Sequence, residues 1–204
     1  MMNKKGTALI VLGLCLLLGA AGLAGYNLWD ENRAAQSVDS VIRQMETLIP
    51  QHGPAELPEG MIPDHILAPN MEMPTIEVDG YNYIGYLNIP AVEISLPVMA
   101  DWSYDNLKEA PCRYAGSAYL DDMVVCAHNY TRHFGRLGRL RIGDTVEFTD
   151  VDGNLFTYVV AEKEQLAPDE AKQMLSGDWD LSLFTCTLGG QYRTTIRCER
   201  VDEV

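Results

Sequence analysis

The stretch LSLFTCTLGGQYRTTIRCERV, residues 181–201, contains two strand-like runs separated by a pair of glycines. β-Branched and aromatic residues are frequent in both runs, and Gly189-Gly190 can adopt the backbone angles of a tight turn. The pattern predicts an antiparallel hairpin. Cys186 comes near the end of the first strand, where a loop can leave its thiol accessible, and Arg193 returns near that thiol on the second strand.

The chain from Gly80 onward consists of further short β-like runs separated by turn residues. These runs are YIGYLNI (83–89), VEISLPV (92–98), MVVCAH (123–128), TVEFTD (145–150) and LFTYVVAE (155–162). Asp152-Gly153-Asn154 predicts a hairpin turn between the last two runs. Two short helices are expected, at residues 104–108 and 168–175. Seven or eight short strands in this region predict a mainly β fold that closes, or nearly closes, into a barrel.

The N-terminus carries an uncharged apolar run at residues 6–25, preceded by Lys4 and Lys5. A helix of about 20 residues is long enough to cross a bilayer core. The sequence therefore predicts a transmembrane signal-anchor at 6–29, with residues 1–5 as a cytoplasmic tail and everything after Trp29 outside the cell. A cleaved signal peptide is the competing interpretation, but the apolar run is longer than the usual core of such a peptide.

Three segments are expected after the anchor. Residues 30–49 place apolar side chains at helical spacing, which predicts an amphipathic helix with Asp30 as its N-cap and Pro50 as its stop. Residues 50–79 are rich in proline and predict a linker. Residues 80–204 form the expected catalytic domain.

Charge limits the classes of partner. The formal net charge is −14, and the part after residue 29 carries −16, because all 29 acidic residues but only 13 of the 15 basic ones lie there. Binding of nucleic acid needs clustered Lys and Arg, so a nucleic-acid partner is excluded. The expected domain is acidic and is held at the membrane by its anchor.

Cys186 alone is read most simply as a buried structural thiol. His128 changes this interpretation, because it ends the apolar run MVVCA and lies at a second strand end. A barrel gathers strand ends at a rim, so Cys186 and His128 are expected to meet there. Arg193 is the preferred third member, since a guanidinium favours a thiolate and can donate hydrogen bonds to an oxyanion. Arg197 shares its strand face but lies farther from the turn.

Four motifs in the expected order resemble the sortases, membrane-anchored cysteine transpeptidases of Gram-positive bacteria. They span residues 83–201: YIGYLNIPAVEISLPV resembles the family's first two strands, AHN around His128 its histidine motif, FGRLGRLRIGDTVEF the segment that follows, and SLFTC ending at Cys186 its T-L-x-T-C motif. Ser182 stands where the last motif usually has Thr, and the loop from Cys186 to Arg193 is shorter than in many members.

The resemblance implies an eight-stranded sortase-type β-barrel with short helices and a thioester mechanism. Cys186 would attack a carbonyl within the C-terminal sorting motif of a secreted protein, and an amine of a cell-wall precursor peptide or a pilin lysine would resolve the thioester. His128 would act as general acid and then general base, and Arg193 would hold the substrate and the oxyanion. The catalytic domain would lie outside the cell membrane.

No cofactor and no obligatory metal are expected. Some sortases use calcium, but the acidic residues Asp121, Asp122 and Asp144 do not reproduce such a site. His133, Asn129 and Tyr130 are secondary candidates near the site. The pairing of Cys112, Cys126 and Cys198 stays open at this point.

Two other functions remain open. A thiol hydrolase of the peptidase type would use the same Cys186, His128 and Arg193 but release the acyl group to water. An inactive sortase-like barrel would act as an envelope binding module. Within the sortases, the subclass is expected to be class B- or D-like, and the end of the chain at Val204 favours wall anchoring over pilin polymerisation. The segment 164–180 is the candidate for substrate specificity.

Overall fold

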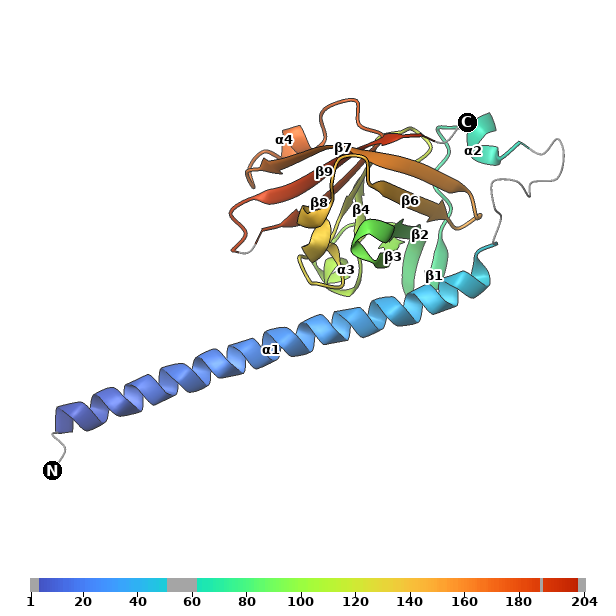
Figure 1. Ribbon diagram of the computed structural model, residues 1–204. Helices are drawn as coiled ribbons and strands as arrows, with labels where there is room; N and C mark the ends of the chain where they lie inside the picture. Colours follow the sequence, from blue (N-terminus) through green and yellow to red (C-terminus); the bar gives the residue numbers. More distant parts are fainter. Residues whose placement is uncertain (1–3, 51–61, 188, 202–204) are drawn as a thin grey trace.

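The computed structural model describes residues 4–50, 62–187 and 189–201. Eight strands close into a barrel in the order β2-β3-β4-β5-β8-β9-β7-β6, because β6 pairs back onto β2, and β1 extends the sheet beside β2 (Figure 1). The strands are β1 Ile76–Val78, β2 Tyr81–Ile89, β3 Ile94–Met99, β4 Cys112–Ala115, β5 Met123–Cys126, β6 Thr145–Asp150, β7 Leu155–Leu166, β8 Leu181–Cys186 and β9 Arg193–Arg200. The expected eight-stranded barrel is confirmed.

The barrel interior is filled by large apolar side chains from alternate strand positions. In β6, Val146 and Phe148 are fully buried while their neighbours are half-buried, and Phe156 and Tyr158 repeat the alternation in β7. Alternation with a period of two gives each strand one face for the core. This interior is the rigid support for the residues at the strand ends.

The pairing of three strands fixes one rim of the barrel. β5 and β8 run parallel with Cys126 opposite Phe184, so His128 and Cys186 each follow two residues beyond this pair. β8 and β9 run antiparallel with Cys186 opposite Arg193. The Thr185 hydroxyl donates to the Ala127 carbonyl at 2.8 Å and ties the ends of β5 and β8 together. The register alone therefore brings the three residues to the same rim.

The turn from β8 to β9 contains the two glycines noted in the sequence. Gly189 and Gly190 have φ of +83° and +70°, which is the left-handed region that residues with a Cβ rarely adopt. The Gly190 amide donates to the Thr187 carbonyl at 2.8 Å, and the Thr187 amide donates to the Tyr192 carbonyl at 2.9 Å. The predicted antiparallel hairpin is confirmed.

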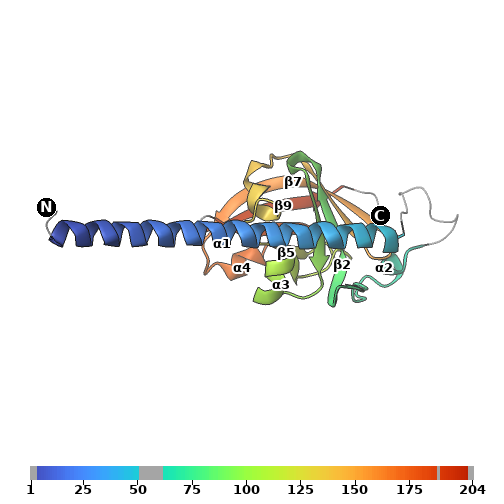
Figure 2. The ribbon, with the colours of Figure 1, turned by 90° about the horizontal axis from the view of Figure 1, so that it is seen from below.

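One continuous helix, α1 (Lys4–Leu48), replaces the expected anchor and separate amphipathic helix (Figures 1 and 2). Asp30 is therefore not an N-cap. The sequence from Tyr26 to Leu48 contains no Gly or Pro to interrupt the helix. The N-terminal half projects beyond the barrel and is long and apolar enough to cross a membrane, whereas the C-terminal half crosses the barrel surface.

The C-terminal half of α1 packs one apolar stripe against the barrel. Ala34, Val38, Val41 and Met45 are buried at spacings of three and four residues. Ile49, just after the helix, is buried as the next member, whereas Leu48 is exposed. The apolar stripe predicted within residues 30–49 therefore packs on the barrel from Ala34 to Ile49. α1 contacts β1, β3 and α3.

The described residues also form three short α-helices, α2 Asp64–Leu67, α3 Tyr104–Glu109 and α4 Ala171–Met174, and two 3-10 helices, η1 Pro90–Val92 and η2 Phe134–Arg139. The Ser103 hydroxyl caps α3 by accepting a hydrogen bond from the Asn106 amide at 3.0 Å. The helix expected at 168–175 is limited to the single turn of α4. The strands β1 and β4 were not predicted, because three or four residues carry little periodic signal. Residues 51–61 of the expected linker, which include His52, lie outside the described residues.

Candidate active site

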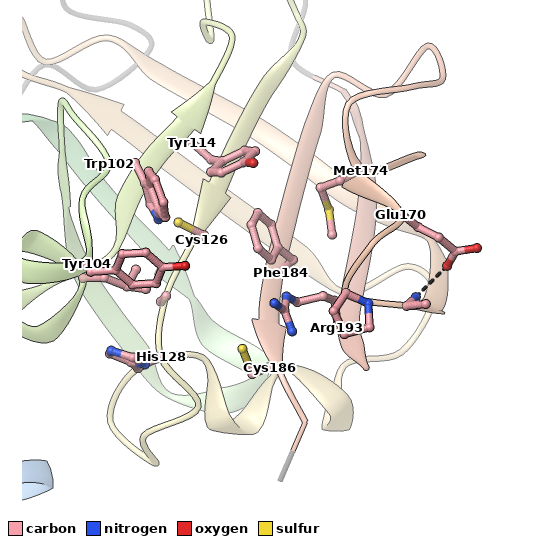
Figure 3. Close-up of a pocket in the computed structure, with 14 residues that line it drawn as sticks. Trp102, Tyr104, Tyr114, Cys126, His128, Glu170, Met174, Phe184, Cys186 and Arg193 are labelled. Atoms are coloured by element: carbon pink, nitrogen blue, oxygen red, sulfur yellow. Dashed lines mark hydrogen bonds between the residues drawn. The ribbon is translucent and has the colours of Figure 1, made fainter. Parts of the chain in front are cut away.

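A pocket of about 290 Å³ opens at the rim where β5, β8 and β9 meet. Cys186, His128 and Arg193 all line this pocket (Figure 3). In the close-up, Arg193 lies beside Cys186 and His128 lies on the opposite side of the pocket mouth. The structure thus brings together the three residues that sequence analysis selected.

Cys186 differs from the other cysteines of the barrel by its accessibility. It is a free thiol and is half-buried, whereas Cys112, Cys126 and Cys198 are free thiols buried in the core. Burial raises the pKa of Cys112 and of Cys198 to about 12, and it also raises the pKa of Cys126. Of these four thiols, Cys186 is the one placed to react as a nucleophile.

His128 lies two residues after β5, in the loop that leads to the 3-10 turn Phe134–Arg139. The Phe134 amide donates to the His128 carbonyl at 3.1 Å, which closes this loop. Burial lowers the pKa of His128, and the Lys108 ammonium acts in the same direction, while the Asp30 carboxylate opposes them. The imidazole is therefore neutral at pH 7 and can accept a proton.

Arg193 and Arg197 are distinguished by their partners. Among the described residues, the Arg193 guanidinium has no hydrogen-bond or ion-pair partner, so it is available to a ligand in the pocket. Arg197 is buried and forms an ion pair with Glu164 at 2.7 Å. It also donates to the Ser182 hydroxyl at 2.8 Å and to two carbonyls at the end of α4. The sequence alone did not indicate that Arg197 is buried and fully paired.

Aromatic side chains form one wall of the pocket, and sequence analysis did not identify them. Trp102 contacts Tyr104 and Tyr114 with ring centroids 5.1 and 5.6 Å apart, and Tyr114 contacts Phe184 at 5.4 Å. All three contacts have the edge-to-face geometry that aromatic pairs favour. The residues come from the β3–α3 segment, β4 and β8, so only the barrel topology brings them together. This wall suits apolar side chains of a ligand.

The secondary candidates have different positions. The Tyr130 ring lies 5.0 Å from the His128 ring and 5.4 Å from the His133 ring. His133 is fully buried, and burial lowers its pKa to about 4, so it is neutral and inaccessible. His133 and Asn129 do not line the pocket. The Tyr130 hydroxyl donates to Asp30 on α1 at 2.5 Å, a contact between residues one hundred positions apart that has no local sequence signal.

Within residues 4–50, 62–187 and 189–201, no group of three or more His, Cys, Asp or Glu side chains is arranged to hold a metal ion. The acidic residues Asp121, Asp122 and Asp144 have other partners: Arg200, the Ser117 amide and the Arg141 amide, respectively.

Solved structures share the fold. A sortase C of Streptococcus pneumoniae superposes with a TM-score of 0.55 at 23% identity, covering 62% of this chain and 72% of that one. Sortase C1 of Streptococcus suis gives 0.51 at 27% identity, covering 60% and 74%. The Pilus Island 1 sortase C2 of Group B Streptococcus gives 0.53 at 22% identity, covering 62% and 77%. These structures are sortases C, and at this level of identity they show the shared fold and not the subclass. Comparison with curated protein sequences gave no match.

The comparison with protein-family models is decisive for the family. Residues 87–201 match the Sortase domain, which is more than half of the chain. The matched stretch includes His128, Cys186 and Arg193 and most of the barrel. The chain therefore belongs to the sortase family of cysteine transpeptidases.

Proposed function

We propose that this protein is a membrane-anchored sortase that joins secreted proteins to an amine of the cell wall or of a pilin. It would cleave a C-terminal sorting motif through a thioester on Cys186 and pass the acyl group to that amine. The observation that supports the proposal is the shared pocket, in which a reachable thiol, a neutral imidazole and an unpartnered guanidinium lie at one rim. These are the three groups that acyl transfer requires.

In the first half of the reaction, His128 accepts the proton of the Cys186 thiol, and the thiolate attacks the backbone carbonyl of the sorting motif. Arg193 donates hydrogen bonds to the oxyanion that forms. The C–N bond then breaks, and His128 returns its proton to the leaving amine. The products are a thioester on Cys186 and the released C-terminal fragment.

In the second half, the incoming amine attacks the thioester, and His128 removes its proton. The Cys186 thiolate leaves and recovers the proton through His128, and an amide bond is formed. The low pKa that burial gives His128 suits both steps, because a neutral imidazole is the form that accepts a proton at pH 7.

Substrate selection would come from the aromatic wall and from α4. Trp102, Tyr114 and Phe184 offer apolar surface to side chains that precede the scissile bond. Glu170 lies at the pocket edge beside α4, and its carboxylate accepts a hydrogen bond from the Ala167 amide at 2.5 Å. This part of the pocket falls in the segment 164–180 that sequence analysis selected for specificity.

The anchor would hold this site at the outer face of the membrane. The apolar half of α1 is exposed along its length, and Lys4 and Lys5 precede it, which favours a cytoplasmic N-terminus. Substrates would then be proteins that pass through the same membrane. The domain boundaries 6–29 for the anchor and 80–204 for the catalytic domain are part of this proposal.

The test uses the full chain in detergent micelles, incubated with a library of sorting-motif peptides with and without an added amine. Intact-mass spectrometry should detect an acyl adduct on the wild-type protein that transfers to the amine when the amine is present. Cys186→Ala should form no adduct while its unfolding midpoint stays near that of the wild type. An adduct formed by Cys186→Ala would refute the nucleophile assignment, and release to water alone would favour a thiol hydrolase.

A further inference from the structure

The membrane-proximal part of α1 is attached to the loop that carries His128. Three hydrogen bonds join helix and loop: Tyr130 hydroxyl to Asp30 at 2.5 Å, Thr131 amide to Glu31 at 2.7 Å, and Arg132 guanidinium to Asp39 at 2.6 Å. Every donor is on the loop and every acceptor is a carboxylate of α1. The loop next to the pocket is therefore held from outside the barrel.

Of these three contacts, the one at Asp30 leads to the catalytic imidazole. The Tyr130 ring lies 5.0 Å from the His128 ring, and the Tyr130 hydroxyl donates a hydrogen bond to the Asp30 carboxylate. Among the described residues, the His128 ring has no hydrogen-bond partner of its own. In hydrolases with a catalytic triad, a carboxylate bonded directly to the histidine supplies the orientation and charge compensation. Here the Asp30 carboxylate is connected to the histidine through the Tyr130 side chain.

We propose that Asp30 and Tyr130 are positioning residues for His128, so that the helix leaving the membrane forms part of the catalytic apparatus. The proposal rests on the proposed function, in which His128 exchanges the proton. Asp30 is the first residue after the expected membrane segment 6–29, so the orientation of the imidazole depends on the anchor helix being seated against the barrel. Tyr130 contacts the His128 ring, and Asp30 holds Tyr130 and supplies negative charge, although it also forms an ion pair with Arg33 at 3.3 Å on the same helix.

The charges around His128 come from several elements. Asp30 on α1 favours the protonated ring, whereas Lys108 on α3 and burial disfavour it. His133 also contacts the Tyr130 ring and is neutral, because burial lowers its pKa to about 4. Cys186 and Arg193 face the ring across the pocket.

The direction of the electrostatic effect follows from these neighbours. The Asp30 carboxylate stabilises the imidazolium that appears during each proton transfer. If this charge is removed, burial and Lys108 are no longer opposed, and the pKa of His128 must fall further.

The helix also provides a matched control. Asp39 lies on the same helix and bonds to the same loop through Arg132, but both side chains are about half exposed. Neither Asp39 nor Arg132 lines the pocket, so Asp39→Asn weakens the attachment without touching Tyr130 or His128. An exposed pair of this kind contributes little to stability. The comparison of Asp30 with Asp39 therefore separates positioning of the histidine from attachment of the loop.

The experiment compares wild type, Asp30→Asn, Tyr130→Phe and Asp39→Asn as full-length chains in micelles. We expect kcat/KM for transfer of a peptide to an amine to fall about tenfold in Asp30→Asn, a part of what general acid–base catalysis contributes. The acid limb of the pH profile, which requires neutral His128, should move to lower pH. Tyr130→Phe should also lower kcat/KM, with a smaller shift of that limb because the charge is kept. Asp39→Asn should stay within about twofold of wild type.

A second measurement does not depend on activity. NMR titration of the histidine-labelled chain gives the pKa of His128, with its signal assigned by its absence from His128→Gln. This pKa should be lower in Asp30→Asn and unchanged in Asp39→Asn. The proposal is overturned if Asp30→Asn matches wild type in either measurement, or if Asp39→Asn reproduces the effect. An inactive wild type would instead refute the proposed function, and the titration would still decide whether Asp30 acts on His128.

Discussion

Two arginines of β9 lie four residues apart, and their surroundings are opposite. Arg193, at the rim, lies beside the thiol of Cys186 and has no side-chain partner among the described residues. Arg197, in the interior, lies across from Ser182 and has four hydrogen bonds. The same residue type on the same strand is thus available to a ligand at one place and stabilises the fold at the other.

The difference shows how a barrel separates reactivity from stability. A buried charge is tolerated only when it is paired, and Arg197 satisfies this with Glu164, Ser182 and the end of α4. A charge at the rim keeps its hydration until a substrate displaces the water, so Arg193 can remain without a partner. The position along the strand, rather than the residue type, decides which role is possible.

The largest effect is expected at Arg193. Arg193→Ala should lower kcat/KM for transpeptidation about 10²- to 10³-fold, the usual cost of removing an oxyanion donor. The free energy of unfolding should stay within about 0.5 kcal/mol of wild type, because no interaction within the described chain is lost. Steady-state kinetics and chemical denaturation of the full chain measure the two quantities. Arg193→Lys keeps the charge without the planar fork and should fall between wild type and Arg193→Ala.

Arg197→Met should give the reverse pattern, with a loss of stability as its main effect. Removing the guanidinium leaves Glu164 unpaired and removes the donors that hold the end of α4, which should lower the free energy of unfolding by roughly 3 kcal/mol. Glu164 is 30% exposed, so water compensates part of the loss. Denaturation followed by tryptophan fluorescence would measure the change.

Ser182→Ala tests the contribution of a single hydrogen bond of Arg197 to stability. It removes one acceptor at 2.8 Å and leaves the ion pair with Glu164 in place. The expected cost is about 1 kcal/mol, the typical contribution of one hydrogen bond. If Arg197→Met were instead as stable as wild type but unable to form the acyl adduct, the roles of the two arginines would have to be exchanged.

The sequence carried enough signal for the barrel and for the residues at its rim. Strand-like runs marked seven of the eight strands that close the barrel, and His128 and Cys186 each stood near the end of such a run. The pairing of β5 with β8 could not be predicted from the sequence, because parallel strands are joined by long connections without a turn signal. Arg193 and Arg197 are four positions apart and so share a strand face. Only the pairing of β9 with β8 and the position of α4 distinguish them.

Contacts between distant segments were the other gap. Nothing near Asp30 indicates that its carboxylate accepts a hydrogen bond from Tyr130, and its residue type favoured a helix cap. The aromatic wall was missed for the same reason, since Trp102, Tyr114 and Phe184 come from three different elements. Local patterns identify elements, whereas side-chain partners depend on how the barrel closes.

A third arginine, Arg200 at the end of β9, provides the smallest expected effect. Its guanidinium bonds to Asp121 at 3.1 Å and lies over the Phe156 ring at 4.8 Å. The Asp121 side chain is 43% exposed, so Asp121→Asn should cost less than about 1 kcal/mol in the free energy of unfolding. Activity should not change, because neither residue lines the pocket. A loss as large as that of Arg197→Met, measured by the same denaturation, would mean that exposure of the acidic partner does not limit what an ion pair on this strand contributes. The contrast drawn between Arg193 and Arg197 would then need another cause.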